Sequence, residues 1–322
     1  MKSNIRGRVT AIHKPRKQRS KFINDFYLYK KHAALAVMLL PVIAFFIIFR
    51  YIPMTGIAMA FKDFRIGLGI WASPWNGLDN FRLLFSMVSF RRAVTNTVII
   101  SLLRIIWGFP APIILAIFLN EIRHIKFKRT LQTISYLPHF LSWVIVGGIL
   151  INILSPTTGI VNQILGWFGI GPFFFLGHND YFRGTLVVTE IWKSVGWGSI
   201  LYLATIAGID TALYEAAMCD GAKRLQRIRY ITLPSLMPTI TILLILNIGS
   251  ILDGGFDQVF NLYNPAVFAT GDIIDTYVYR IGLVDMRFAL GTATGLFKNG
   301  IGFVLVLITN AIARRISDNG LW

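Results

Sequence analysis

The sequence predicts an all-α membrane protein with six transmembrane helices. Of its 322 residues, 55% are hydrophobic and only 15% are charged, and the mean hydropathy is +0.61. A soluble domain carries about 25% charged residues, so this composition disfavours a soluble fold and excludes a disordered chain. The apolar residues gather in six stretches, each long enough to cross a hydrocarbon core of about 30 Å.

The six predicted spans are residues 33 to 54, 94 to 119, 131 to 153, 185 to 208, 236 to 252 and 289 to 313. The first could be mistaken for a signal peptide, but its apolar run is too long and no small-residue cleavage site follows. We interpret it as a retained leading helix. The expected organisation is a basic segment (1 to 32), the leading helix, a loop (55 to 93), a core of five helices (94 to 313) and a tail (314 to 322).

Lys and Arg are distributed unevenly between the loops, which predicts the orientation. Residues 1 to 32, 120 to 130, 209 to 235 and 314 to 322 hold 20 basic and 6 acidic residues, whereas residues 55 to 93, 154 to 184 and 253 to 288 hold 8 of each. The basic set is expected in the cytoplasm, together with both termini. The leading basic segment suits nucleic acid or anionic lipid, and we favour a topology anchor attracted to lipid headgroups, with no nucleic-acid partner.

The sequence lacks the patterns of nucleotide-binding loops, zinc proteases and serine hydrolases. The five histidines include no pair at i, i+4, and Cys219 is the only cysteine, which excludes an intramolecular disulfide and a cysteine-cluster zinc site. We therefore expect no metal, no cofactor and no catalytic residue on this chain, which is not predicted to be an enzyme.

The segment between the fourth and fifth predicted spans, residues 209 to 235, reads as helix, turn and helix. Asp210 and Thr211 can cap a first helix rich in Ala and Met, and Gly221 permits a close approach or a sharp turn. Pro234 and Pro238 are expected at the start of the next span, where amides are unpaired in any case. The segment predicts a short helix that projects into the cytoplasm and suits docking in a groove on another protein.

This segment carries a specific motif. Glu215-Ala216-Ala217, then three residues, Gly221, nine residues and Ile231-Thr232-Leu233-Pro234 resemble the EAA loop of permeases from binding-protein-dependent ATP-binding-cassette importers. In that family the EAA helix docks in a cleft of the cytoplasmic ATPase. The resemblance implies ATPase coupling through Tyr214, Glu215, Ala216, Ala217, Asp220, Gly221, Ala222, Leu233 and Pro234.

The resemblance extends over essentially the whole chain. The span layout and Thr95-Asn96-Thr97 resemble the carbohydrate branch of these permeases, the maltose-type importers of type I. Residues 136 to 142 and 256 to 265 are similar to the subgroup that handles oligosaccharides cut from polysaccharides, above all the larger permease subunits of bacterial alginate importers. The resemblance implies a bacterial inner membrane, a second permease, two ATPase subunits that hold ATP and Mg, an extracytoplasmic solute-binding protein and an oligosaccharide.

Charged residues inside the predicted spans are costly and usually face a cavity or a partner. Arg50, Arg104, Lys193 and Lys298 outnumber Glu190 there, and this cation excess favours an anionic solute. Glu190, Lys193 and Trp197 recur at i, i+3 and i+7, so we expect them on one helical face. The resemblance implies that the spans flanking the EAA loop line the solute path. The predicted path residues are Arg104, Glu190, Lys193, Trp197, Asn247, Ser250, Asp253 and Lys298.

We hypothesise that the chain forms half of the path for acidic, alginate-type oligosaccharides. The same importer class for a neutral oligosaccharide is one alternative. A secondary carrier or channel for an anionic solute, with Arg104, Glu190 and Lys193 as an ion-coupled relay, is another. A third is an enzyme acting on lipid-linked sugars through Asp272, Asp275 and Asp285. Glu190 and Lys193 could also form only an ion pair, and Arg104 could pair with another subunit.

Overall fold

The computed structural model describes residues 33–249 and 252–316. The predicted basic segment, Ser250 and residues 317–322 of the predicted tail lie outside this range. The chain divides into two compact units, Met1–Gly56 and Ile57–Trp322, which are described separately.

The first unit consists of α2 (Ala33–Phe46), the π-helical turn η1 (Ile47–Tyr51) and the start of the 3-10 helix η2 (Ile52–Phe61). Its large apolar side chains are exposed on all sides, with Met38 73% and Phe49 63% accessible. A helix that is apolar all round belongs in lipid or in a protein interior. The run Val37–Phe61 is long and apolar enough to cross a membrane, in agreement with the predicted leading helix.

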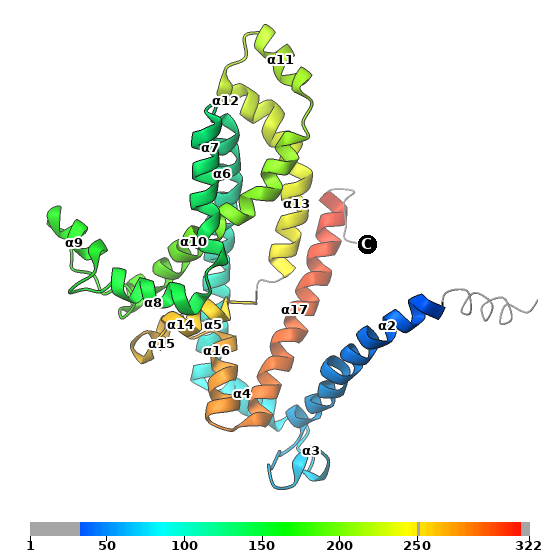
Figure 1. Ribbon diagram of the computed structural model, residues 1–322. Helices are drawn as coiled ribbons and strands as arrows, with labels where there is room; N and C mark the ends of the chain where they lie inside the picture. Colours follow the sequence, from blue (N-terminus) through cyan, green and yellow to red (C-terminus); the bar gives the residue numbers. More distant parts are fainter. Residues whose placement is uncertain (1–32, 250–251, 317–322) are drawn as a thin grey trace, which may run out of the picture. The chain divides into compact units, whose positions relative to one another are not determined.

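The second unit is built from helices (Figure 1). Within the described residues the only strand-like pairing is an isolated bridge between Lys62 and Trp75. The helices are α3 (Gly69–Ala72), α4 (Asp79–Ser86), α5 (Val88–Leu103), η3 (Arg104–Gly108), α6 (Pro110–Glu121), α7 (Ile125–Tyr136), η4 (Leu137–Phe140), α8 (Trp143–Ile153), α9 (Ile160–Trp167), α10 (Asn179–Ala207), α11 (Thr211–Cys219), α12 (Arg224–Arg227), η5 (Ile228–Thr232), α13 (Leu233–Gly249), α14 (Phe256–Leu262), η6 (Pro265–Val267), α15 (Phe268–Gly271), α16 (Ile274–Tyr279), η7 (Arg280–Val284) and α17 (Phe288–Ile316).

The 29-residue helix α10 organises the second unit, because it packs along α6 and also contacts α7, α13 and α15. Ala116, Tyr202, Ile206 and Leu236 form a buried cluster that joins α6, α10 and α13. Gly196 lets α10 approach α7 closely, since a Cβ there would overlap the Ser135 carbonyl. A second cluster joins α5, α8, α10 and α14 around Phe182 and Val259.

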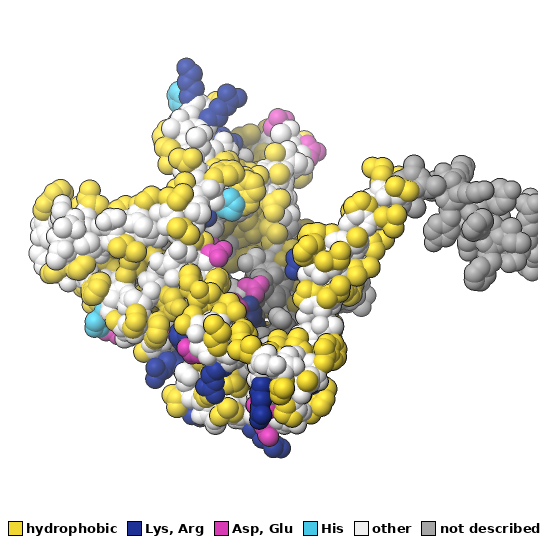
Figure 2. Space-filling view, turned by 60° about the horizontal axis from the view of Figure 1, so that its bottom comes forward, with side chains coloured by type: hydrophobic (Ala, Val, Ile, Leu, Met, Phe, Trp, Pro, Cys, Tyr) yellow, Lys and Arg dark blue, Asp and Glu magenta, His cyan; other side chains and the backbone are white. Residues whose placement is uncertain are grey.

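Among residues 33–249 and 252–316, four helices are long and apolar enough to cross a membrane, and up to six spans result if each of two bent helix pairs counts as one. The four are Val37–Phe61, Val88–Glu121, Arg224–Gly249 and Phe288–Ala311, and the bent pairs are Ile125–Phe140 with Trp143–Ile153 and Asn179–Ala207 with Thr211–Cys219. The predicted count of six agrees with the larger number. Hydrophobic side chains cover much of the face shown in Figure 2, as lipid contact requires.

The predicted continuous span over residues 131 to 153 is wrong in one respect, because the chain bends by 106° within it. Pro138 lacks an amide to continue the helix, and Leu141 and Ser142 adopt extended backbone angles. Ser142 then caps α8, its Oγ accepting from the Ile145 amide at 3.4 Å. The segment is apolar enough for a membrane span, but its backbone bends sharply between η4 and α8.

The prediction that Pro234 opens a span also needs correction. The helix that contains Pro234 begins at Arg224 and runs to Gly249, so both Pro234 and Pro238 lie inside it. A π-helical turn, η5, directly precedes α13, and the Leu233 amide reaches back five residues to Ile228 O. A wider turn of this kind accommodates the missing amide of proline without ending the helix.

Candidate functional site

Helix α11 is capped at both ends by its own sequence. Asp210 Oδ1 accepts from the Ala212 amide at 2.9 Å, as predicted for this cap. At the other end Gly221 has a φ of +80°, and the amides of Gly221 and Ala222 donate to the carbonyls of Met218 and Ala217. This pair of bonds is a Schellman motif, which requires the left-handed conformation that glycine adopts without strain. The turn at Gly221 therefore sets the direction in which the chain leaves α11.

Most of the surface of α11 is exposed, beside α12 at one end of the second unit (Figure 1). Tyr214 is half-buried, and its hydroxyl lies 2.9 Å from the Thr232 Oγ1 in η5. Glu215, Ala216, Asp220, Gly221, Leu233 and Pro234 are exposed, and Ala217 and Ala222 are half-buried. Most of the predicted coupling residues are thus accessible, and Tyr214 attaches α11 to η5 at the start of the following span.

A cavity of about 390 Å³ lies between η3, α6, α10 and α13. Among the predicted path residues Arg104, Glu190, Trp197, Asn247 and Asp253 line it, whereas Lys193 and Lys298 do not. The volume falls within the range of small-ligand sites, about 300–1,000 Å³. The structure therefore brings together residues that lie up to about 150 positions apart in the sequence, and leaves two of the predicted lysines outside.

Lys193 does not line the cavity together with Glu190 and Trp197, which differs from the prediction. Residues at i and i+3 differ by about 60° around a helix, whereas i and i+7 nearly coincide. Lys193 is 8% exposed and donates to His139 O at 3.0 Å, at the corner before α8, and its Nζ lies 5.4 Å from the Trp143 ring centre. Glu190 instead accepts from the Ser194 hydroxyl at 2.7 Å. Within the described residues no ion pair joins Glu190 to Lys193.

Trp197 presents its indole to the cavity from α10 and is 47% exposed. The His139 ring stacks on it with centroids 4.7 Å apart and an interplanar angle of 1°, and Phe140 packs edge-on at 5.7 Å. These two residues hold the indole in place. A positioned aromatic ring at a cavity wall is suited to stack on a sugar ring.

Arg104 is held at the cavity by neutral groups. Its Nη2 donates to the Gln258 Oε1, and Gln258 Nε2 donates to Leu186 O at 2.7 Å and to Thr189 Oγ1 at 2.8 Å. The Nε of Arg104 is buried and has no hydrogen-bond partner within the described part of the chain. The guanidinium thus retains donor capacity for an anion, such as the carboxylate of a solute or of another subunit. Sequence reasoning noted the stretch 256 to 265 but missed the role of Gln258, because an uncharged side chain does not indicate which groups it bonds after folding.

Lys298 is neutralised by carboxylates from the segment 253 to 288, which is predicted to lie outside the membrane. Its Nζ lies 2.8 Å from Asp253 Oδ1 and 2.8 Å from Asp275 Oδ1. The charged residues that line the cavity are then Arg104, Glu190 and Asp253. The cation excess counted within the spans is therefore absent from the cavity in this conformation, because that count left out the loop carboxylates that fold onto Lys298.

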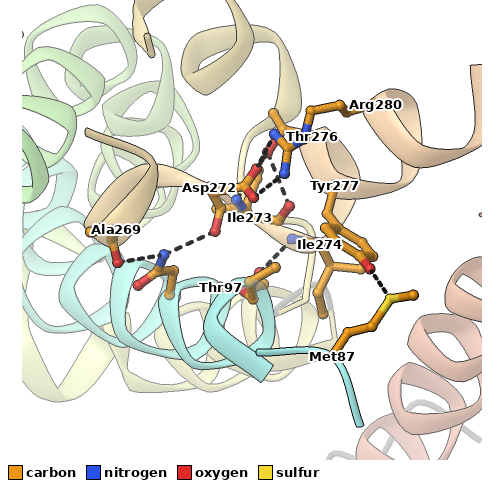
Figure 3. A network of polar contacts seen from close by, with 11 residues as sticks. Met87, Thr97, Ala269, Asp272, Ile273, Ile274, Thr276, Tyr277 and Arg280 are labelled. Atoms are coloured by element: carbon orange, nitrogen blue, oxygen red, sulfur yellow. Dashed lines mark hydrogen bonds and ion pairs between the residues drawn. The ribbon is translucent and has the colours of Figure 1, made fainter. Parts of the chain in front are cut away.

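A buried polar network fastens the segment before α16 to α5 (Figure 3). Asp272 is 4% exposed, forms an ion pair with Arg280 and accepts from Thr276 Oγ1 at 2.9 Å. Thr97 Oγ1 accepts from the Ile274 amide at 2.8 Å. Burial would lower the pKa of Arg280, but the hydrogen bonds and charge of Asp272 outweigh it and raise this pKa above its usual value. Asp272 and Asp275, two of the carboxylates considered for an enzyme, are thus engaged in ion pairs.

Comparison with known proteins identifies a family that this chain matches. The profile described as "Binding-protein-dependent transport system inner membrane component" matches residues 108–318. The chain is 42% identical to Protein LplB of Bacillus subtilis, covering 91% of this chain and 92% of the relative. It is 40% identical to the polygalacturonan/rhamnogalacturonan transport system permease protein YteP of the same species, covering 94% and 92%.

Two solved structures are similar as well. One chain of a bacterial ABC transporter "involved in the import of the acidic polysaccharide alginate" superposes with a TM-score of 0.85 at 44% identity, covering 91% of this chain and 99% of that one. A chain of a bacterial alginate ABC transporter in complex with an alginate pentasaccharide-bound periplasmic protein gives a TM-score of 0.85 at 43% identity, covering 92% and 99%.

Proposed function

This chain belongs to the binding-protein-dependent transport system inner membrane components, and we propose from that premise that its solutes are acidic oligosaccharides built from uronic acids. It is the permease of an ATP-binding-cassette importer. The permease is proposed to form half of the translocation path, and the cavity beside α10 is proposed to be part of that path.

The observation that carries the choice of solute is Arg104. Its guanidinium lines the cavity, is held by a neutral amide and keeps a buried donor without a partner. A uronate carboxylate supplies the acceptor that this donor lacks, while Trp197 offers a stacking surface for the sugar. The likeness to an alginate importer and to a polygalacturonan/rhamnogalacturonan permease supports the same class of solute.

The partners follow from the importer class. We propose a second permease, two ATPase subunits that hold ATP and Mg, and an extracytoplasmic solute-binding protein. The chain itself is proposed to bind no cofactor and to carry out no chemistry. The exposed surface of α11 is proposed to dock in the ATPase, so that closure of the ATPase dimer reorients the spans. The excess of Lys and Arg over residues 1 to 32, 120 to 130, 209 to 235 and 314 to 322 taken together supports a cytoplasmic location for α11 and for both termini.

Uptake by the complete assembly in proteoliposomes tests the proposal. We expect ATP-dependent uptake of uronate oligomers in preference to carboxyl-reduced oligomers of equal length and to malto-oligosaccharides. Arg104→Gln is expected to lower uptake of the uronate oligomer more than tenfold, with a smaller effect on neutral sugars. Preference of the wild-type assembly for neutral sugars would contradict the acidic solute. Uptake that does not need ATP would contradict the importer mechanism.

A further inference from the structure

Asp253 lies between two hollows of the second unit. One is the cavity of about 390 Å³ beside α10. The other is a more open hollow of about 500 Å³ bordered by α14, α16 and η7, among them Phe256, Asp275 and Tyr279. Asp253 lines both. A solute that moves from one hollow to the other therefore passes this carboxylate.

The carboxylate of Asp253 shares a single cation with Asp275. Lys298 Nζ donates to Asp275 Oδ1 at 2.8 Å and Oδ2 at 2.9 Å, and it lies 2.8 Å from Asp253 Oδ1. An ammonium group has three N–H donors, so these three oxygens account for all of them. Two carboxylates and one ammonium leave this group with one negative charge in excess.

The two carboxylates are held very differently. Asp275 belongs to the first turn of α16, is 25% exposed and contacts Lys298 through both oxygens. Asp253 contacts it through one oxygen, is 69% exposed and lies on the connection between α13 and α14. Gly254 and Gly255 follow it, and Gly255 has a φ of +76°. Asp253 can therefore move away while Lys298, which is 14% exposed, remains neutralised by Asp275.

We propose that Asp253 is an exchangeable partner of Lys298, and that the carboxylate of a uronate residue takes its place as the solute passes. This inference rests on the proposed function. The exchange replaces one carboxylate at Lys298 by another, so Lys298 keeps its charge-assisted hydrogen bonds. A neutral sugar offers only hydroxyl groups and forms a weaker contact. The site selects anionic solutes by exchange, without requiring an unpaired cation in the resting protein.

Two asparagine variants at the same lysine test the exchange, because it predicts opposite effects for them. Asp253→Asn removes the resident competitor and should tighten binding of a uronate tetramer about two- to fivefold, the range that an exposed ion pair supports. Asp275→Asn leaves Asp253 as the sole carboxylate of Lys298, so Asp253 is held more firmly and uronate binding should weaken by a similar factor. Binding of the carboxyl-reduced tetramer should change less than twofold in both variants.

Binding is measured by calorimetry on the purified complex of both permeases and the ATPases, without the solute-binding protein. Asp285→Asn, which removes an exposed carboxylate elsewhere, controls for net charge and should leave uronate binding unchanged. Equal shifts of the same sign in the two test variants, or equal shifts for uronate and reduced tetramer, would overturn the exchange. If Asp275→Asn does not assemble, the comparison of Asp253→Asn with Asp285→Asn decides alone.

Different results would refute the acidic solute and the exchange at Lys298. A wild-type complex that binds uronate and reduced tetramers equally would refute the acidic solute itself. A wild-type preference for the uronate, with both variants shifted alike, would refute only the exchange at Lys298.

Discussion

Gly255 is the residue on which the position of the Arg104 guanidinium depends most directly. It adopts a φ of +76°, and a Cβ there would overlap the guanidinium of Arg104. Gly255→Ala is expected to lower the free energy of unfolding by about 1–3 kcal/mol, through backbone strain and displacement of the buried side chain. The melting temperature of the detergent-solubilised permease measures this loss.

Gly300→Ala is the matched control for that substitution. Gly300 lies inside α17 with nothing within 4 Å of an added Cβ. Alanine is the better helix former, so this variant should melt at the same or a higher temperature. An unchanged melting temperature for Gly255→Ala would show that Arg104 is not confined as described.

Asp272 is the second residue for which the structure predicts a large effect of substitution on stability. Its carboxylate is 5% exposed and pairs with Arg280, which is 26% exposed. Asp272→Asn leaves the guanidinium without its counter-charge and should lower the free energy of unfolding by about 2–3 kcal/mol. Asp285→Asn, at an exposed position in the same region, should change stability by less than about 0.5 kcal/mol. Equal thermal stability of the two variants would contradict a structural role for the buried network.

At this scale the sequence predicted several residues that line the cavity, but it did not predict the contacts of the others. Glu190, Trp197 and Arg104 could be placed at one cavity because charge and aromaticity are visible in sequence. Lys193 could not, because the carbonyl that attracts it belongs to His139 at a corner of another helix. Gln258 was missed for a related reason: its importance comes only from the three groups it bonds in the folded chain.

At the scale of elements, α11 should depend on one hydroxyl contact. Tyr214→Phe removes the partner of Thr232, a 2% exposed residue, and loosens α11 from η5. We expect solute-stimulated ATP hydrolysis to fall severalfold while basal hydrolysis and membrane insertion stay unchanged. Tyr230→Phe removes the same group from a residue that is 69% exposed and should have no effect. Identical coupling in both variants would argue against this attachment.

The EAA surface itself has a separate test. Glu215→Lys reverses a charge on the exposed face of α11, and Gly221→Pro is incompatible with a φ of +80° at the end of that helix. Both should reduce assembly with the ATPase or solute-stimulated hydrolysis, and neither should affect membrane insertion. Transport at the wild-type rate in both variants would refute the coupling role.

Elements with strong local signals were predictable, whereas those set by backbone geometry were not. The cap at Asp210 and the turn at Gly221 follow from residue type and appear as expected. The corner after Phe140 and the continuous helix through Pro234 were not expected. Hydropathy measures how apolar a window of residues is and carries no information about the direction of the helix axis. A bent and a straight segment of the same composition therefore have the same hydropathy.

At the scale of the whole molecule, the single cysteine reports orientation. Cys219 is exposed on α11, and the proposed topology places it in the cytoplasm. A membrane-impermeant maleimide should label it in inverted vesicles that contain the permeases alone, and not in intact spheroplasts. Cys219→Ser provides the blank. Labelling from outside the cell would overturn the orientation.

Assembly with the ATPases extends the same measurement. If α11 docks in the motor subunit, the thiol should become protected in inverted vesicles that hold the complete importer. Labelling at an undiminished rate would separate a correct orientation from an incorrect docking surface.

The distribution of Lys and Arg along the chain predicts an orientation, which stays a prediction, but the charge counted within the spans did not predict the local charge of the cavity. The net charge of +17 and the segregation of Lys and Arg are properties of the sequence. The neutralisation of Lys298 depends on two carboxylates that lie 45 and 23 positions before it and meet it only after folding. A sum of charges over the spans therefore does not predict which charges the folded chain leaves at the cavity.

The corner between η4 and α8 has a mechanical consequence. At this corner, Lys193 of α10 bonds the His139 carbonyl, and Trp197 of α10 stacks on the His139 ring. Helix α8, which follows the corner, packs on α14. Gln258 of α14 bonds both Leu186 of α10 and Arg104. These contacts close a ring. If a solute carboxylate binds Arg104 as proposed, we expect the displacement to reach α10 through Gln258, because Gln258 bonds both Arg104 and Leu186. The far end of α10 leads into α11.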